Sequence, residues 1–191
     1  ELVTVAHDQG VYVVQMSTQS VYWNVSSVDR VDDAVIDNEG ELWLAFFAGK
    51  RRADQYDTTG DTGISSTTIS AGISSLEILN DGRLVMASYD KKIYVHATDG
   101  SLSTTLTEPN GIVSYMEQTD NSTLLAGTTG GTIYHYEIDT WTASSLGLGH
   151  TKQTTLLAAH NGMYIAGSKP GKVAFIDQSN LTIIESFSAS G

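Results

Sequence analysis

The chain repeats itself about every forty residues, and this periodicity limits its possible folds more than any other feature. In each repeat a turn is followed by an apolar strand that ends in small residues. Five such segments begin at Gly10, Gly40, Gly82, Ser122 and Gly162. The spacings between these starts are 30, 42, 40 and 40 residues, and a second apolar strand follows eleven residues after each of the last three starts. Spacing this regular indicates a protein built from repeated structural units.

Each repeat contains enough sequence for four short strands. The third repeat predicts strands over Ser75–Leu79, Arg83–Ser88, Lys92–Ala97 and Ser101–Leu106, separated by turn-forming residues such as Asn80-Asp81-Gly82. No window of eleven or more residues has helical periodicity. Repeats of about forty residues with four strands each are typical of β-propeller blades.

The sequence therefore predicts an all-β chain that forms a single β-propeller domain, residues 1–191. Five blades are expected, over residues 1–31, 32–68, 69–107, 108–150 and 151–191. The first repeat is about ten residues short, so we expect its outer strand to be missing or rudimentary. The last repeat has sequence for all four of its own strands, so no strand needs to be exchanged between the termini. Both a small five-bladed ring and five blades of a larger ring, for example a seven-bladed one, fit this pattern.

The composition of the chain limits its binding partners and its cellular setting. The chain has 10 basic and 22 acidic residues, a net charge of −12, which disfavours direct binding to nucleic acid. The longest apolar run, Leu42–Ala48, is far shorter than the roughly 20 residues of a membrane-spanning helix. Cysteine is absent, so there is no disulfide scaffold and no thiolate. The compartment stays open: a soluble intracellular location fits, and three glycosylation sequons, at Asn24, Asn121 and Asn180, fit a secreted or surface-exposed one.

Two segments resemble WD40 repeats. The segment SYDKKIYVHA, Ser88–Ala97, resembles the closing part of a WD40 repeat, and Gly149-His150 resembles the Gly-His pair that opens one. The resemblance implies a protein-binding platform and a polar link between the opening His, a Ser or Thr, the turn Asp and a Trp. Here Asp90 and His150 lie in different repeats, and no Trp stands at the last position. The last repeat, Lys172–Phe187, is similar to YVTN-type and quinoprotein-like propellers.

Motifs for catalysis, cofactors and metals are absent from the sequence. There is no G-x-S-x-G element, no phosphate-binding loop and no paired histidine spacing, so we expect no catalytic residue, no cofactor and no metal. An alternative site would use carboxylates on the innermost strands around the propeller channel. Asp33, Glu77 and Glu117 recur near the first strands of three repeats, and Glu77 and Glu117 are forty residues apart. Such carboxylates could bind or hydrolyse carbohydrate, bind a cation or solvate the channel.

Charged residues separate between the two kinds of turn. The turns between second and third strands hold seven of the ten basic residues, namely Lys50, Arg51, Arg52, Lys91, Lys92, Lys169 and Lys172. The other turns within repeats hold ten of the 22 carboxylates, namely Asp8, Asp37, Glu39, Asp57, Asp61, Asp81, Asp99, Asp120, Asp139 and Asp177. Because turns of one kind open on one face of a propeller, the sequence predicts one basic and one acidic face.

Two functions follow from these patterns. The first is a non-catalytic protein–protein interaction scaffold, a subunit of a larger assembly, whose basic face docks an acidic or phosphorylated segment of a partner. Its candidate residues are Lys50, Arg51, Arg52, Phe47, Tyr89, Lys91, Lys92, Lys169 and Lys172. The second is a secreted or surface propeller that binds or hydrolyses carbohydrate in its channel. Lysine at hairpin tips and aspartate in Asx turns would also explain the charge pattern without any partner.

Overall fold

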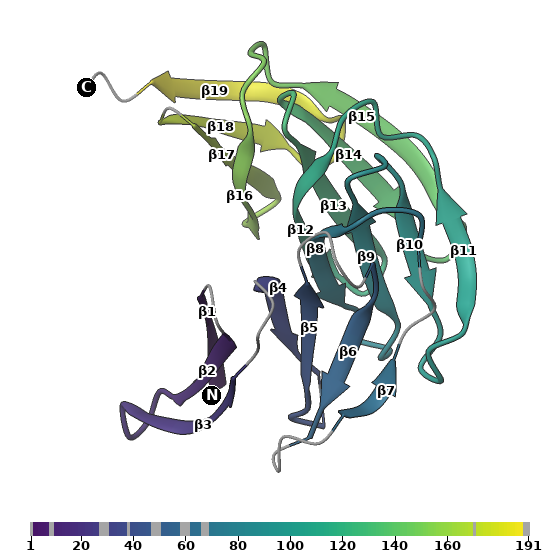
Figure 1. Ribbon diagram of the computed structural model, residues 1–191. Coiled ribbons are helices and arrows are strands. Elements are labelled where there is room, and N and C mark those ends of the chain that lie inside the picture. The colour runs from purple at the N-terminus through teal and green to yellow at the C-terminus, as the bar shows by residue number, and fades with distance from the viewer. Residues whose placement is uncertain are drawn as a thin grey trace. The chain divides into compact units, whose positions relative to one another are not determined.

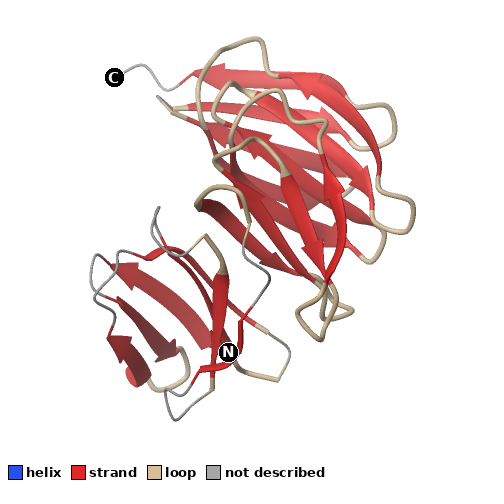
Figure 2. Cartoon of the chain, turned by 45° about the vertical axis from the view of Figure 1, so that its right-hand side comes forward, coloured by secondary structure: helices blue, strands red, loops and turns tan. Residues whose placement is uncertain are grey.

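The computed structural model describes residues 2–7, 10–26, 31–37, 39–46, 51–57, 62–65, 69–169 and 171–188. Every regular element in these ranges is a β-strand, which confirms the predicted all-β class (Figure 2). The same ranges contain no helix long and apolar enough to cross a membrane. The chain divides into two compact units, Glu1–Thr105 and Leu106–Gly191, which are described separately below.

The first unit contains three sheets, and within each sheet a strand pairs with the next strand along the chain (Figure 1). The first sheet has three described strands, β1 (Leu2–His7), β2 (Gly10–Gln15) and β3 (Ser20–Ser26). The second sheet comprises β4 (Val31–Ile36), β5 (Leu42–Phe46), β6 (Ala53–Tyr56) and β7 (Thr62–Ser65). The third comprises β8 (Ile73–Ile78), β9 (Leu84–Ser88), β10 (Ile93–His96) and β11 (Leu102–Leu106), the last residue of which begins the second unit.

The second unit contains two further four-stranded sheets with the same strand order. The fourth sheet comprises β12 (Val113–Asp120), β13 (Thr123–Thr128), β14 (Thr132–Glu137) and β15 (Thr142–Gly147). The fifth comprises β16 (Thr154–His160), β17 (Met163–Ser168), β18 (Lys172–Asp177) and β19 (Thr182–Ser188). Each predicted strand of the third repeat is present within one or two residues. The expected short first repeat is present as a three-stranded sheet in the described residues.

The first strand of each of the last four sheets carries an irregularity at the same place. The pairing register shifts between Val31 and Asp33, and again at the corresponding residues of β8, β12 and β16. A bulge turns the following side chain and sharpens the local twist. The residue after the shift, for example Asp33, is therefore placed to reach the neighbouring sheet.

Successive side chains of a strand point to opposite faces of its sheet. A sheet that lies between two others in the chain therefore has two apolar faces. On β5, Leu42 and Leu44 pack in one cluster with Val11 and Val13 of the first sheet. The intervening Trp43 packs in a second cluster with residues of the third sheet. We call the face turned toward the next sheet in the chain the leading face, and the opposite one the trailing face. In the first unit each described interface joins a leading face to a trailing face.

The second unit repeats this arrangement. Leu125 and Ile133, on the leading face of the fourth sheet, form one buried cluster with Leu157, Tyr164 and Ile176, on the trailing face of the fifth. All five side chains are at most 3% exposed. Burial of this apolar area is what holds two successive sheets together.

One leading-face position carries only small residues. Ala45, Ala87, Gly127 and Gly167 occupy equivalent places in the ladders of four successive sheets. At Gly127 an added Cβ would lie 2.6 Å from Cβ of Thr154 on β16, in the next sheet. The backbone of β13 therefore approaches β16 more closely than a side chain allows.

Replacing Gly127 with alanine should reduce stability, because the added methyl group would force β13 away from β16. We expect a loss of about 1–3 kcal/mol in the free energy of unfolding, measured by urea denaturation. The matched control is Gly147→Ala, where nothing lies within 4 Å of an added Cβ. Equal stability of the two variants would contradict this close packing.

Candidate functional site

The turns between second and third strands are anchored by the same backbone hydrogen bond in three sheets. In each case the first turn residue donates its N–H to the segment that precedes the first strand of the same sheet. The pairs are Tyr89 to Gly72 (2.9 Å), Thr129 to Ile112 (2.8 Å) and Lys169 to Gln153 (3.0 Å). The donors are forty residues apart, so Tyr89 and Lys169 occupy equivalent positions at the ends of their sheets.

A second position in these turns has a left-handed backbone. Gly131 and Gly171 have φ values of +78° and +81° there. The equivalent residues in the second and third sheets are Arg51 and Lys91, with φ values of +54° and +69°. Left-handed backbone costs a residue with a side chain about 1–2 kcal/mol, whereas glycine adopts it freely. Two of these four turns therefore hold an exposed cation where glycine is the unstrained choice.

Hydrogen bonds through Ser70 join these two cationic turns. The Arg51 carbonyl accepts the N–H of Ile69 (2.8 Å), and the Arg51 guanidinium lies 3.5 Å from the Ser70 carbonyl. The Ser70 hydroxyl donates to Asp90 and lies 3.0 Å from the Tyr94 hydroxyl. We call the set Arg51, Ser70, Tyr89, Asp90 and Lys91 the turn platform.

The aromatic and acidic members of the turn platform are also held in place. The Tyr89 hydroxyl donates to Asp32 on β4 (3.0 Å), which ties the third sheet to the second, and the Tyr89 side chain is still 39% exposed. The Tyr94 hydroxyl donates to Asp90 (2.7 Å). Partial burial of Asp90 opposes its ionisation, but the hydrogen bonds from Ser70 and Tyr94 outweigh it and lower the pKa of Asp90. Hydrogen bonds thus hold the side chains of Tyr89 and Asp90 in a surface that also carries two exposed cations.

The remaining predicted docking residues differ in their surroundings. Arg52 forms an ion pair with the buried Asp54, at 2.6 Å between Nε and Oδ1, so its charge is already compensated. Lys92 is half-buried in the turn, where its backbone N–H donates a hydrogen bond to the Asp90 carboxylate. Lys169 and Lys172 belong to the second unit, and Phe47 and Lys50 lie outside the described residues.

Sequence reasoning missed Ser70 and Asp32, the two residues that brace the platform. The repeat could have pointed to Ser70, because Asn110 and His150 follow it at intervals of forty residues. Each of these two residues also forms a hydrogen bond with a later strand of its own sheet. The Asn110 N–H donates to the Tyr134 hydroxyl (2.9 Å), and Nε2 of His150 lies 3.2 Å from the Ser168 hydroxyl. The His–Ser link that the WD40 resemblance implies is therefore present at His150. Burial, followed by the nearby charge of Lys172, lowers the pKa of His150.

Asp33, one of the three candidate channel carboxylates, bridges two sheets. One of its carboxylate oxygens accepts the Ala34 N–H (2.9 Å), and the other accepts the Leu76 N–H (2.7 Å) and the Ser75 hydroxyl (3.1 Å) of β8. Burial raises the pKa of Asp33, although these hydrogen bonds oppose the shift. Its oxygens join β4 to β8, which is a structural role.

Glu77 and Glu117 occupy equivalent positions on their strands, because they pair with Val85 and Leu125, forty residues apart. Asp33 stands two residues earlier in its strand. Burial raises the pKa of Glu117, which lies half-buried on β12. Glu77 belongs to the first unit and Glu117 to the second. A carboxylate function in the channel remains a prediction from the sequence.

At least five of the eight described carboxylates of the predicted acidic turns accept the backbone N–H two residues later, namely Asp37, Asp81, Asp99, Asp120 and Asp177. Asp99 and Asp177 each accept both the backbone N–H and the hydroxyl of the serine two residues later. These hydrogen bonds lower the pKa of both groups. Asp81 accepts the Arg83 N–H in the same way (3.1 Å) and also pairs with the Arg83 guanidinium (2.7 Å). The guanidinium contact and then the backbone hydrogen bond lower the pKa of Asp81. These contacts are the Asx turns that the charge pattern also fitted; Asp8 and Asp61 lie outside the described residues.

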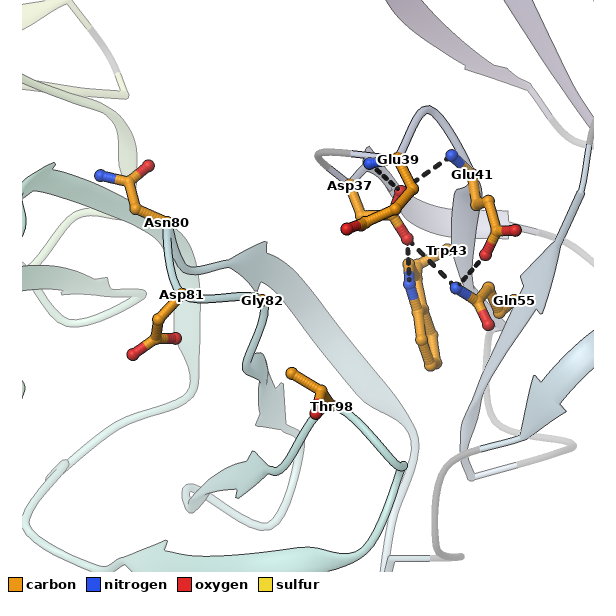
Figure 3. A pocket seen from close by; sticks show the side chains of 9 residues that line it. All are labelled: Asp37, Glu39, Glu41, Trp43, Gln55, Asn80, Asp81, Gly82 and Thr98. Atoms are coloured by element: carbon orange, nitrogen blue, oxygen red, sulfur yellow. Dashed lines mark hydrogen bonds between the residues drawn. The ribbon is translucent and has the colours of Figure 1, made fainter.

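A pocket of about 380 Å³ opens between the second and third sheets at these turns (Figure 3). Its lining residues are Asp37, Glu39, Glu41, Trp43, Gln55, Asn80, Asp81, Gly82 and Thr98. Asp37 and Glu41 converge on the Gln55 amide, which donates to both at 3.1 and 2.5 Å. Partial burial and then the negative charges of neighbouring carboxylates raise the pKa of Glu41. The neutral donors Trp43 and Gln55 and the Arg83 guanidinium, which pairs with Asp81, compensate part of the negative charge of this pocket.

A related pocket of about 400 Å³ lies between the fourth and fifth sheets. His135 and Gln178 line it where Gln55 and Thr98 line the first pocket, eighty residues earlier in both cases. Such hollows are therefore a repeated consequence of sheet packing. The described residues contain no group of three or more His, Cys, Asp or Glu that could hold a metal ion.

Comparisons with known proteins identify the fold. No protein-family model matches the chain, and no curated protein matches its sequence. Its structure, in contrast, matches 1533 solved chains, so the architecture is common and does not by itself select a function. One match is a propeller chain in the crystal structure of a mitotic checkpoint complex, with a TM-score of 0.85 and 16% sequence identity.

That match covers 100% of this chain and 61% of the checkpoint-complex chain. The present chain thus spans less than two thirds of the length of the protein it resembles. Together with the sheet order, the match establishes an all-β propeller of about five blades. From here on, the five sheets are called blades.

Asp33 should make the stability of the protein depend on pH in a defined direction. Because the pKa of Asp33 is raised in the folded state, its contribution is most favourable below the unfolded value of 3.8 and is lost as the pH rises through the folded pKa. Urea denaturation should show wild type losing stability relative to Asp33→Asn as the pH rises above about 4. A difference that is constant with pH would contradict the burial of this carboxylate.

Proposed function

We propose that the protein is a non-catalytic interaction module, a subunit of a larger assembly, which docks an acidic or phosphorylated segment of a partner protein on the turn platform. The observation that carries the proposal is the pair of cations in left-handed turn positions, Arg51 and Lys91. The fold alone would be served better by glycine at both positions, as in the fourth and fifth blades. The strained backbone is explained if the two charged side chains serve binding.

The surroundings of these cations support the same function. Arg51 and Lys91 are exposed, and the hydrogen bonds through Ser70 fix their turns relative to each other within the first unit. Tyr89 stands two residues before Lys91 in the same turn, is 39% exposed and can supply an apolar contact. A surface that is rigid before binding loses little conformational entropy on docking. Exposed charges of this kind contribute mainly to association rate and to salt dependence.

Lys92, Arg52, Lys169 and Lys172 would have secondary roles in this proposal. The charge of Arg52 is engaged by Asp54, and Lys92 is half-buried. Lys169 and Lys172 would extend the contact only for a partner that also reaches the second unit. The central determinants are therefore Arg51, Lys91 and Tyr89.

The double variant Arg51→Gly/Lys91→Gly separates binding from folding. It removes both charges and relieves both left-handed turns, but the larger backbone entropy that glycine loses on folding offsets most of that gain. We therefore expect unchanged stability or a gain of up to about 1 kcal/mol. Binding to the tightest member of a panel of glutamate-rich and phosphoserine peptides, measured by fluorescence anisotropy, should weaken by about 3- to 30-fold. The difference should shrink at high salt.

A charge-matched control tests whether net charge alone explains any loss. Ser103→Glu/Ser145→Glu changes the net charge by the same two units on exposed positions of outer strands, and it should bind like wild type. Unchanged binding in the glycine variant would refute the proposed site. A clear loss of stability in that variant would show instead that the two cations are structural.

A further inference from the structure

The three basic residues of the second unit gather at one end of the fifth blade. They are Lys152, in the segment before β16, Lys169, in the turn between β17 and β18, and Lys172, at the start of β18. We call these three residues the lysine cluster. The turns at the opposite ends of the strands hold carboxylates instead, namely Asp120, Asp139 and Asp177. In a chain with a net charge of −12, positive charge is therefore concentrated in one defined place of this unit.

The side chain of His150 joins the two segments that carry the lysine cluster. Its Nδ1 accepts the backbone N–H of Lys152 (3.3 Å), and its Nε2 lies 3.2 Å from the hydroxyl of Ser168, the residue before Lys169. Because Nδ1 acts as an acceptor, we assign the ring proton to Nε2, which then donates to the Ser168 hydroxyl. His150 is therefore neutral in this arrangement and holds the two segments together without adding a charge.

Backbone contacts fix the same two segments further. The Lys169 N–H donates to the Gln153 carbonyl (3.0 Å), and Lys172 is the first residue of β18 in its ladder with β17. At Gly131, in the turn between β13 and β14, an added Cβ would clash with the His150 carbonyl, so this turn of the fourth blade packs closely against the same segment. The three lysines thus start from backbone positions that are fixed before a ligand binds, which lowers the entropic cost of binding.

The charges of the lysine cluster are not compensated within the described residues. No described carboxylate forms an ion pair with Lys152, Lys169 or Lys172, whereas two arginines of the first unit are paired with aspartates. Lys152 and Lys169 are exposed, and Lys172 is half-buried. Burial and then the positive charge of Lys172 lower the pKa of His150, which places Lys172 within electrostatic reach of the ring. Uncompensated cations on neighbouring segments suit an anion that carries more than one charge.

We propose that the lysine cluster, with His150 between its two segments, is a binding site for a phosphate dianion, which a free phosphate ester or a phosphorylated side chain of a partner would supply. A phosphate group carries a charge of about −1.5 to −2 at pH 7 and three strong acceptor oxygens. It can therefore contact several ammonium groups at once, whereas a carboxylate offers one charge and two oxygens. The proposal goes beyond the proposed function, because it uses none of the residues of the turn platform.

Proton NMR of the His150 ring tests the site on the wild-type chain, with sulfate as the probe because it stays a dianion over the pH range in which histidine titrates. A bound dianion would oppose the effect of Lys172, so the pKa of His150 should rise when sulfate replaces chloride at constant ionic strength. His160 is the internal control, because it is exposed at the opposite end of β16 and should not respond. Equal shifts of both rings, or no shift of His150, would overturn the proposal.

Removal of two of the charges gives a second test, with inorganic phosphate as the probe at pH 7.5. The affinity is read from the His150 signals, so binding to the turn platform does not contribute and the two proposals can fail separately. Lys152→Gln/Lys172→Gln should weaken the affinity by about 3- to 30-fold. The control Ser103→Glu/Ser145→Glu changes the net charge by the same two units on exposed outer-strand positions and should bind like wild type.

Unchanged affinity in the lysine variant would overturn the site. An equal loss in the control would also overturn it, because net charge alone would then explain the attraction. The same His150 signals, followed during titration with phosphoserine and with a phosphoserine peptide, identify the source of the phosphate. A peptide that binds at least tenfold more tightly indicates a phosphorylated partner, and equal affinities indicate a free phosphate ester.

Discussion

Face-to-face packing of successive sheets is the interaction on which the rest of this structure depends. A four-stranded sheet whose two faces are both apolar is not stable alone in water, because it needs a neighbour on each side. Val11 and Val13 bury against Leu42 and Leu44, and Leu125 buries against residues of the fifth blade. The close approach at Gly127 follows from the same packing. The forty-residue repeat in the sequence reflects this packing, because each repeat supplies one sheet.

Polar contacts then fix the segment before a blade against that blade, and the turns of the proposed binding surface are held by such contacts. Ser70, Asn110 and His150 each join the segment before a blade to the second or third strand of that blade. Since those links hold the turns firmly, a side chain at the tip of a turn is presented in a defined position. Arg51 and Lys91 use this rigidity and tolerate a backbone conformation that glycine would adopt without strain.

Much of the fold was predictable from the sequence because strand periodicity and turn chemistry are local. The strands of the third repeat and the short first repeat follow from spacing alone. The bulges were not predictable. The ladder pairs match Asp33 with Ser75 rather than with Glu77, and Asp33 bridges β4 and β8. The brace from Tyr89 to Asp32 joins residues 57 apart, which no local pattern can reveal. The basic charge of the turns could be read from the sequence. The ion pair by which Asp54 compensates the charge of Arg52 could not.

The central claim is that packing between blades stabilises both partners of each interface. Hydrogen exchange of the backbone amides, measured by mass spectrometry on wild type and Leu125→Ala, tests it most directly. Leu125 is fully buried in the interface between the fourth and fifth blades. Our account predicts that the variant exchanges faster in both β12–β15 and β16–β19, because the two sheets lose a shared contact. Faster exchange confined to β12–β15 would contradict it and would mean that each blade is stable by itself.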